Sequence, residues 1–265
     1  METDKVFAGP VPQLYDRHLG PILFQPFAEV VAERLSETDR DILETAAGTG
    51  VVTRAIAAAV PQSNILATDL NQAMLDVAAE KTQAGHLKWQ QADAQSLPLE
   101  AGSFDVVVCC FGIMFMPDKQ AAYREARRVL RPKGRFIFTV WDRIETNPLM
   151  HIADATVAKL FPENPPHFLA RTPCGYNDKA RIERELREAG FTSVRVEEVQ
   201  RESDVSSAGE PAMGLCQGTP LRGEIEASDP KGLVRATDAV AAATRESFGY
   251  GPFRAPLQAL LVTAS

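Results

Sequence analysis

Residues 41–57, DILETAAGTGVVTRAIA, constrain the fold of this chain more than any other stretch. Two apolar residues lead to an acid, Glu44, and only small residues follow as far as Gly50. An apolar helical pattern then begins at Val51. A strand, a small-residue turn and a helix N-terminus in this order are typical of a nucleotide-type binding site. Because Gly48 and Gly50 lack a Cβ atom, the loop can turn sharply and a ligand can lie against its backbone.

Two further predicted strands also end in an acid. Residues 64–69 (NILATD) are an apolar strand that ends at Asp69, and residues 88–94 contain a shorter strand that ends at Asp93. The segment 104–111 (FDVVVCCF) is apolar almost throughout, which suits a strand covered on both faces. Alternation of strands and helices predicts a doubly wound parallel sheet with right-handed crossovers. Ligands of such sheets bind beyond the carboxyl ends of the strands, where all of these acids fall.

Acids at the ends of three successive strands resemble the class I S-adenosylmethionine-dependent methyltransferases. The first motif of that family is an acid followed by alternating glycines, acid-x-Gly-x-Gly-x-Gly. Here these positions are held by Glu44, Ala46, Gly48 and Gly50, so that alanine replaces the first glycine. The run ADAQSLPLEAGSFDVVVCCFGIMFMPD resembles the branch of the ubiquinone and menaquinone biosynthesis methyltransferases (methyltransferase type 11). The resemblance extends from about Tyr15 to Trp141.

The resemblance implies an α/β, Rossmann-like fold, with a doubly wound seven-stranded sheet, mostly parallel, whose last strand is antiparallel, and a helical cap. It also implies S-adenosylmethionine as the cofactor and S-adenosylhomocysteine as the product. Asp69 would accept hydrogen bonds from the ribose hydroxyls, since one carboxylate suits a vicinal diol. Asp93 would accept from the adenine amine, and the Ala94 N–H would donate to the ring. Glu44 would orient the loop or the amino end of the cofactor, and Phe111 would line the pocket near the methyl donor. The expected cofactor-binding residues are Tyr15, Glu44, Ala46, Gly48, Gly50, Asp69, Leu70, Met74, Asp93, Ala94 and Phe111.

Two of these residues have a structural interpretation as well. Met74, early in a helix predicted over residues 72–83, either lies against the adenine face or is an ordinary core residue. Tyr15 either lies near the methionine end of the cofactor or packs within a capping helix. The dipeptide Gly20-Pro21 predicts that the N-terminal segment is split into two helical pieces.

The sequence identifies no catalytic residue. Transfer of a methyl group from a sulfonium is an in-line displacement that requires alignment and a dry pocket but no metal. An oxygen or carbon nucleophile would also need a general base. The candidates for that base are His18, His151, His167 and Tyr15. The apolar residues 113–116 suggest a hydrophobic or aromatic acceptor, although their packing in the core is slightly preferred.

The domain organisation follows from where the strand–helix pattern breaks. A proline-rich irregular segment after the fifth strand is typical of a lid, and a long insertion separates the last two strands. We expect N-terminal cap helices over 1–36, a cofactor-binding core over 37–144, a lid segment over 145–176, a core helix and strand over 177–200, a cap insertion over 201–253 and a final core strand over 254–265.

Charge and composition limit the partners. A net charge of -7 disfavours a broad nucleic-acid surface. Four cysteines without a CxxC motif disfavour a zinc site or a disulfide framework and favour a reducing compartment. With no signal peptide and no long apolar run, we expect a cytoplasmic protein with no stable membrane association. We expect a small-molecule methyl acceptor and no nucleic acid, and leave a homodimer open.

A basic cluster at Arg124, Arg127, Arg128 and Arg131 is interpreted as a solvated helix face rather than a patch for an anionic substrate.

Three alternative functions stay open. An NAD(P)-dependent oxidoreductase would need G-x-G-x-x-G, but Thr53 stands where the third glycine belongs. A non-catalytic S-adenosylmethionine-binding protein fits the same motifs, because no obligatory catalytic residue is recognised. A nucleic-acid methyltransferase fits less well, since the residues after the fourth strand are CFGI rather than an Asn-Pro-Pro-Tyr type sequence.

Overall fold

The computed structural model describes residues 7, 9–82 and 84–265, and the chain divides into two compact units. The helical unit comprises residues 1–26, 142–175 and 200–258, and the sheet unit comprises residues 27–141, 176–199 and 259–265. Residues 1–6 of the predicted N-terminal cap lie outside the described residues. The sequence analysis placed its boundaries after residues 36, 144, 176, 200 and 253. The role of the outer segments as a cap stays a prediction.

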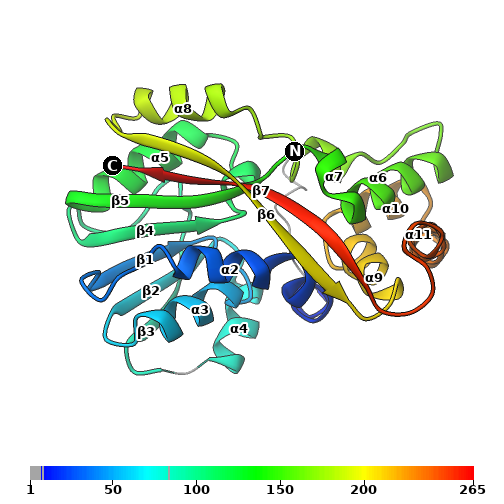
Figure 1. The fold of residues 1–265 in the computed structure, drawn as a ribbon, viewed down its shortest axis with the longest axis horizontal. Helices are drawn as coiled ribbons and strands as arrows, with labels where there is room; N and C mark the ends of the chain where they lie inside the picture. The colour runs from blue at the N-terminus through cyan, green and yellow to red at the C-terminus, as the bar shows by residue number, and fades with distance from the viewer. Residues whose placement is uncertain (1–6, 8, 83) are drawn as a thin grey trace. The chain divides into compact units, whose positions relative to one another are not determined.

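A seven-stranded sheet with the order β3-β2-β1-β4-β5-β7-β6 forms the sheet unit and confirms the predicted fold class (Figure 1). Its strands are β1 (Asp41–Thr45), β2 (Asn64–Asp69), β3 (Leu87–Gln91), β4 (Phe104–Cys110), β5 (Leu130–Trp141), β6 (Val194–Val205) and β7 (Phe253–Ala264). The first five strands pair in parallel, and β7 pairs antiparallel with β5. The carboxyl ends of β1, β2, β3 and β4 therefore meet at one edge of the sheet.

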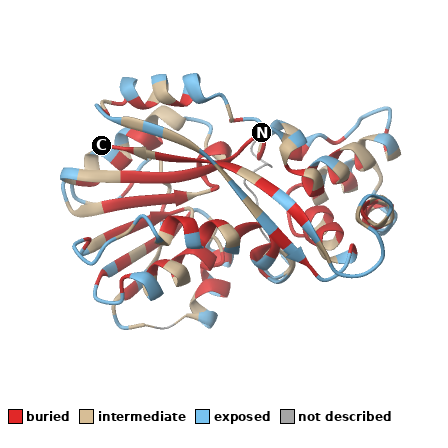
Figure 2. Cartoon of the chain, in the orientation of Figure 1, coloured by how far each residue is buried: buried red, intermediate tan, exposed pale blue. Residues whose placement is uncertain are grey.

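Helices flank the sheet. They are α2 (Gln25–Ala32), α3 (Val51–Ala59), α4 (Gln72–Lys81), the short 3-10 helix η3 (Ile113–Phe115), α5 (Lys119–Val129) and α8 (Lys179–Glu188). α3 and α4 contact β2, α4 also contacts β3, and α5 contacts both β5 and α8. The three consecutive valines at positions 106–108 of β4 are completely buried, so the central strand is covered on both faces as predicted (Figure 2).

The helical unit contains the remaining helices. They are α1 (Val11–Leu14), the π-helix η2 (Tyr15–Phe24), the 3-10 helix η4 (Ile144–Thr146), α6 (Pro148–Leu160), α7 (Phe168–Arg171), α9 (Gly209–Gln217), α10 (Leu221–Ser228) and α11 (Gly232–Phe248). α9 contacts η2, α6, α10 and α11. A Cβ atom at Gly214 of α9 would lie 2.3 Å from Leu19 of η2, so glycine permits this close approach. The sequence analysis predicted neither α7 nor α10.

The predicted break at Gly20-Pro21 is wrong, because residues 11–32 are helical throughout. The middle of this segment is π-helical, and the Gln25 N–H donates to the carbonyl of Gly20, five residues earlier. Proline breaks an α-helix through its missing N–H and its clash with the carbonyl four residues back. The wider π-helical turn relieves that clash, so the helix continues past Pro21.

The basic cluster predicted as a solvated helix face extends beyond α5, because Arg131 lies in β5. Arg124 and Arg127 are exposed, as a solvated face requires. Arg131 instead makes 2.8 Å ion pairs with Asp41 and Asp105. Arg128 is held by Glu125 of the same helix at 2.7 Å and also donates to backbone carbonyls of the loop before β4. The sequence could not show these contacts, because most of the partners lie about 25 or more residues away.

Candidate cofactor-binding site

The loop between β1 and α3 has a backbone that few residues adopt. Ala46, Gly48 and Gly50 all have positive φ, at 53°, 57° and 77°. The Ala47 N–H donates to the carbonyl of Thr68 in β2 at 2.9 Å, which holds the loop beside the end of that strand. Glycine adopts this conformation without a steric penalty, whereas alanine pays one.

Ala46, the departure from the family motif, has a compensating neighbour in Gly112. A Cβ atom at Gly112 would lie 2.4 Å from the Cβ of Ala46 and 2.8 Å from the Sγ of Cys109. The methyl group of Ala46 thus occupies space that Gly112 leaves free. Gly112 is not among the predicted site residues, and no local pattern marks it, since its partner lies at another strand end.

Gly48 and Gly50, the two glycines of the motif, have different roles. A Cβ at Gly50 would lie 2.9 Å from Trp89 of β3 and 3.1 Å from Ala78 of α4, so Gly50 is required by packing as well as by its φ. A Cβ at Gly48 would meet only the Met74 side chain, at an ordinary 3.6 Å. Gly48 is therefore the glycine whose surroundings leave room against the backbone.

Asp69 joins the glycine loop to the turn after β2. One carboxylate oxygen accepts the Gly48 N–H at 2.8 Å, and the other accepts the Asn71 N–H at 2.8 Å. Burial raises the pKa of the Asp69 carboxyl above its ordinary value. The Asn71 side-chain amide also lies 3.5 Å from the oxygen that accepts the Asn71 N–H. A carboxylate oxygen offers two lone pairs, so the oxygen that accepts from Gly48 keeps acceptor capacity. Asn71 occupies the N-cap position of α4, but its side chain makes no capping bond.

Glu44 is the most deeply buried acid of the motif, with 1% of its surface exposed. Burial, with the nearby charge of Asp69, raises the pKa of its carboxyl to about 8. Within the described residues, Glu44 Oε2 and Thr49 Oγ1 are buried without a hydrogen-bond partner. Buried polar atoms are normally paired. Two unpaired atoms beside one glycine loop fit a polar ligand such as the amino acid end of S-adenosylmethionine.

The predicted residues after β2 and β3 differ in exposure. Leu70 is 40% exposed, a rare state for a large apolar side chain in this molecule. Met74 is 4% exposed and lies against Gly48, so it is a core residue at the edge of the loop. Asp93 and Ala94 are half-buried in a tight turn. The exposed face of Leu70 suits contact with a flat apolar group.

Phe111 follows β4 with an unusual positive φ of 52°. Its ring stacks on Trp141 at 4.1 Å between centroids and meets Phe27 edge-on at 5.4 Å. The structure thus places Phe111 in an aromatic cluster, where it is 5% exposed. Its role as a wall near the methyl donor stays a prediction. Backbone strain of this kind concentrates at functional sites.

Ten of the eleven predicted residues lie in the sheet unit, and Tyr15 lies in the helical unit. There its ring stacks on Phe24 at 4.8 Å. Two candidate bases in the same unit have an acid nearby: His167 Nδ1 is 3.0 Å from a buried oxygen of Asp154, and His18 Nδ1 is 3.8 Å from Glu210. No catalytic role is assigned to them. In the described part of the chain, no group of three or more His, Cys, Asp or Glu side chains could hold a metal ion.

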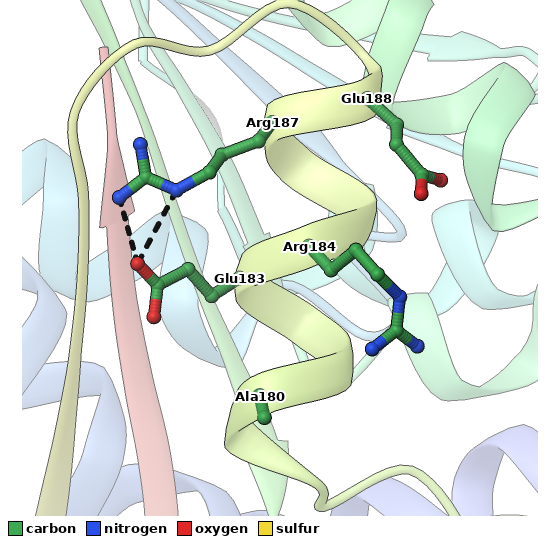
Figure 3. A pocket seen from close by; sticks show the side chains of 5 residues that line it. All are labelled: Ala180, Glu183, Arg184, Arg187 and Glu188. Atoms are coloured by element: carbon green, nitrogen blue, oxygen red, sulfur yellow. Dashed lines mark hydrogen bonds and ion pairs between the residues drawn. The ribbon is translucent and has the colours of Figure 1, made fainter.

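A surface hollow elsewhere contains none of the predicted site residues. It lies on α8 and is lined by Ala180, Glu183, Arg184, Arg187 and Glu188 (Figure 3). Arg187 and Glu183 form a 2.7 Å ion pair across one helical turn. Such a pair on an exposed helix face is ordinary surface chemistry. Of the helices that the structure describes, none is long and apolar enough to cross a membrane.

Comparison with known proteins agrees with this geometry. Residues 43–138 match the profile of a methyltransferase domain family. The chain is 36% identical over 125 residues to ubiquinone/menaquinone biosynthesis C-methyltransferase UbiE of Methylobacterium nodulans, covering 46% of the chain and 50% of that protein. It is 31% identical over 166 residues to demethylmenaquinone methyltransferase of Lactobacillus johnsonii, covering 57% of the chain and 68% of that protein. The matches thus span about half to two thirds of the length of these curated relatives.

Solved structures share the fold at low identity. Phosphoethanolamine N-methyltransferase 2 of Haemonchus contortus, in complex with S-adenosyl-L-methionine, has a TM-score of 0.58 at 18% identity over 96% of this chain and 56% of that one. The [4+2]-cyclase SpnF has a TM-score of 0.57 at 19% identity, covering 96% and 92%. The sequence relatives, the sheet order and the glycine loop together show that this chain belongs to the class I S-adenosylmethionine-dependent methyltransferases, in the UbiE-like branch.

Proposed function

We propose that this protein transfers a methyl group from S-adenosylmethionine to a small-molecule acceptor and releases S-adenosylhomocysteine. The observation that carries the proposal is the buried acid pair beside the glycine loop. Asp69 is held by two backbone N–H groups with acceptor capacity to spare, and Glu44 keeps an unpaired buried oxygen. These are acceptor groups that suit a ribose diol and the ammonium group of the amino acid end.

The residues of the sheet unit would hold the cofactor in the following way. Asp69 accepts from the ribose hydroxyls, Asp93 accepts from the adenine amine, and Leu70 covers an apolar face of the base. Glu44 orients the loop or the amino end, beside the open backbone of Gly48. When bound, S-adenosylmethionine supplies a methyl group already activated by its sulfonium. The acceptor atom would displace the thioether in line, and the protein would contribute alignment and exclusion of water.

A hydrophobic or aromatic acceptor is the narrower part of the proposal. Its support is that the curated relatives are named for ubiquinone and menaquinone biosynthesis. The apolar run after β4 supports it less, because Ile113 and Met114 are buried in the core, at 1% and 5% exposure. Only Phe115 and Met116 of that run are half-buried.

Binding without methyl transfer is the second candidate function. The shared fold of a protein named as a [4+2]-cyclase favours keeping it, since a fold alone does not determine the reaction. Incubation with methyl-labelled S-adenosylmethionine and a panel of quinols and phenols separates the two. Label in an organic product supports the transferase. Tight binding with no labelled product across the panel supports the binder.

The binding step is tested by calorimetric titration with S-adenosylmethionine, S-adenosylhomocysteine and NAD. We expect binding of the first two and none of NAD. Asp69→Ala should lower the affinity for S-adenosylhomocysteine by at least about a hundredfold, which corresponds to the loss of two hydrogen bonds to a charged group. Asp76→Ala is the control and should bind normally, because it removes an exposed acid of α4 that accepts from Gln72 in the preceding turn. Binding of NAD instead would restore the oxidoreductase hypothesis.

A further inference from the structure

The turn after β3 contains Gln95, which is not among the proposed cofactor contacts. The side chain of Gln95 has two hydrogen-bond partners. Residues 93–96 form a tight turn, closed by the Ser96 N–H donating to the Asp93 carbonyl at 3.0 Å. Within it, the Gln95 backbone N–H donates to Asp93 Oδ1 at 2.9 Å. The Gln95 side-chain amide also donates to that carboxylate, at 3.0 Å to Oδ1 and 3.3 Å to Oδ2.

The other end of the Gln95 amide is occupied too. Its Oε1 accepts the backbone N–H of Asp118 at 2.9 Å, directly before α5. The Asp118 side chain in turn caps α5 by accepting from the Ala121 N–H at 2.9 Å. Because a backbone N–H can only donate, the amide oxygen must face Asp118 and the amide NH2 must face Asp93. The orientation of the Gln95 amide is therefore set by its partners.

We propose that Gln95 is a positioning residue that orients the Asp93 carboxylate for the exocyclic amine of adenine and so sets the base preference of the cofactor site. The inference rests on the proposed function. Two donors from Gln95 occupy Asp93 Oδ1, whereas Oδ2 receives a single, longer bond. With two lone pairs on each carboxylate oxygen, Oδ2 keeps the acceptor capacity that an amine needs.

A purely structural role for Gln95 is the competing interpretation, and the rest of the loop argues against it. The Leu97 N–H donates to Glu125 at 2.7 Å, and Arg128 donates to the carbonyls of Leu97 and Leu99 at 3.0 and 2.7 Å. These contacts already hold the loop on α5 without Gln95. What Gln95 adds is control over the rotation of one half-buried carboxylate.

The test compares two ligands that differ at one position of the base. S-adenosylhomocysteine carries an amine there, and S-inosylhomocysteine carries an oxygen, which a carboxylate repels. Calorimetric titration of the wild-type protein, Gln95→Leu and the nearly isosteric Gln95→Glu gives the ratio of the two affinities. Gln120→Leu is the matched control, because the Gln120 amide links α5 to the Glu185 carbonyl of α8 at 2.9 Å, away from the turn.

We expect the wild-type protein and Gln120→Leu to share one strong preference for adenine. Gln95→Leu should lower the affinity for S-adenosylhomocysteine about tenfold, which is the effect of one charge-assisted hydrogen bond. It should lower the affinity for S-inosylhomocysteine less than about twofold. Gln95→Glu should lose the preference for adenine at least as much as Gln95→Leu does, since it replaces the amide donor with a second negative charge. A general loosening of the loop would weaken both ligands alike.

The outcomes separate this inference from the proposed function. If the wild-type protein binds S-adenosylhomocysteine and both Gln95 variants keep its affinity ratio, Gln95 does not position Asp93, while the proposed function stands. If the wild-type protein binds neither ligand, the proposed function fails and this inference fails with it.

Discussion

At the scale of single residues, the buried carboxyl of Glu44 makes stability depend on pH. Its pKa of about 8 lies above the ordinary 4.5, so the folded protein retains a proton that the unfolded chain releases. The stabilisation is complete below the ordinary value and is lost as the pH rises towards 8. As the pH rises from about 5 to about 8, the wild-type protein loses this stabilisation and Glu44→Gln does not. The unfolding free energy of Glu44→Gln should therefore rise, relative to that of the wild-type protein, by on the order of 3 kcal/mol over this range.

Urea unfolding of the ligand-free proteins at several pH values measures this gain. Glu183→Gln, an exposed acid on α8, is the control and should follow the wild-type pH profile. Parallel profiles for Glu44→Gln and the wild-type protein would show that Glu44 is ionised in the folded state at neutral pH. The same variant should bind S-adenosylmethionine more weakly, because the ammonium group favours ionisation of Glu44 on binding and an amide cannot ionise.

The pair Ala46 and Gly112 gives a second prediction at this scale. Gly112→Ala places a methyl group 2.4 Å from the Ala46 Cβ, and overpacking of this kind costs about 1–3 kcal/mol. In an Ala46→Gly background that contact disappears, although Cys109 Sγ remains at 2.8 Å. A double-mutant cycle by urea unfolding should therefore give a coupling energy of about 1 kcal/mol, with the double variant less damaged than the sum. Strictly additive costs would mean that the two positions do not compete for space.

At the scale of elements, α5 holds the loop between β3 and β4. Arg128 donates to both oxygens of Glu125 and to two loop carbonyls, and Glu125 accepts the Leu97 N–H. Arg128→Met keeps the apolar stem and removes all of these donors. We expect a loss of about 1–3 kcal/mol in unfolding free energy, because two partly buried loop carbonyls and Glu125 lose their partners.

The matched control on the neighbouring helix is Arg187→Met. Its ion pair with Glu183 is exposed on α8, and such pairs contribute less than about 0.5 kcal/mol. Chemical denaturation of both variants measures the difference, and amide hydrogen exchange should show faster exchange in residues 93–102 for Arg128→Met only. Equal losses for the two variants would mean that Arg128 does not anchor the loop.

At the scale of the whole molecule, most of the sheet unit was predictable. The bounds of β2 and β4 agree with the predicted strands, and the helix after the glycine loop begins at Val51 as expected. A local signal failed at Pro21, which does not end its helix because the segment is π-helical there. Local signals also do not show that β5 begins at Leu130, which pairs with Phe104 of β4 before a register shift.

The candidate site divides in the same way. The alternation of apolar strands and helices, with acids at the strand ends and glycines in the first loop, is local information. The sequence by itself therefore determined the fold class, and it predicts ten residues of the sheet unit as candidates for the cofactor site. Tertiary structure alone decided that Gly50 is required by Trp89 and that Gly112 makes room for Ala46. It also decided that Gln95 connects Asp93 to Asp118. These contacts join strand ends and loops about 23 to 66 residues apart, and no periodic pattern encodes which distant side chains meet when the sheet closes.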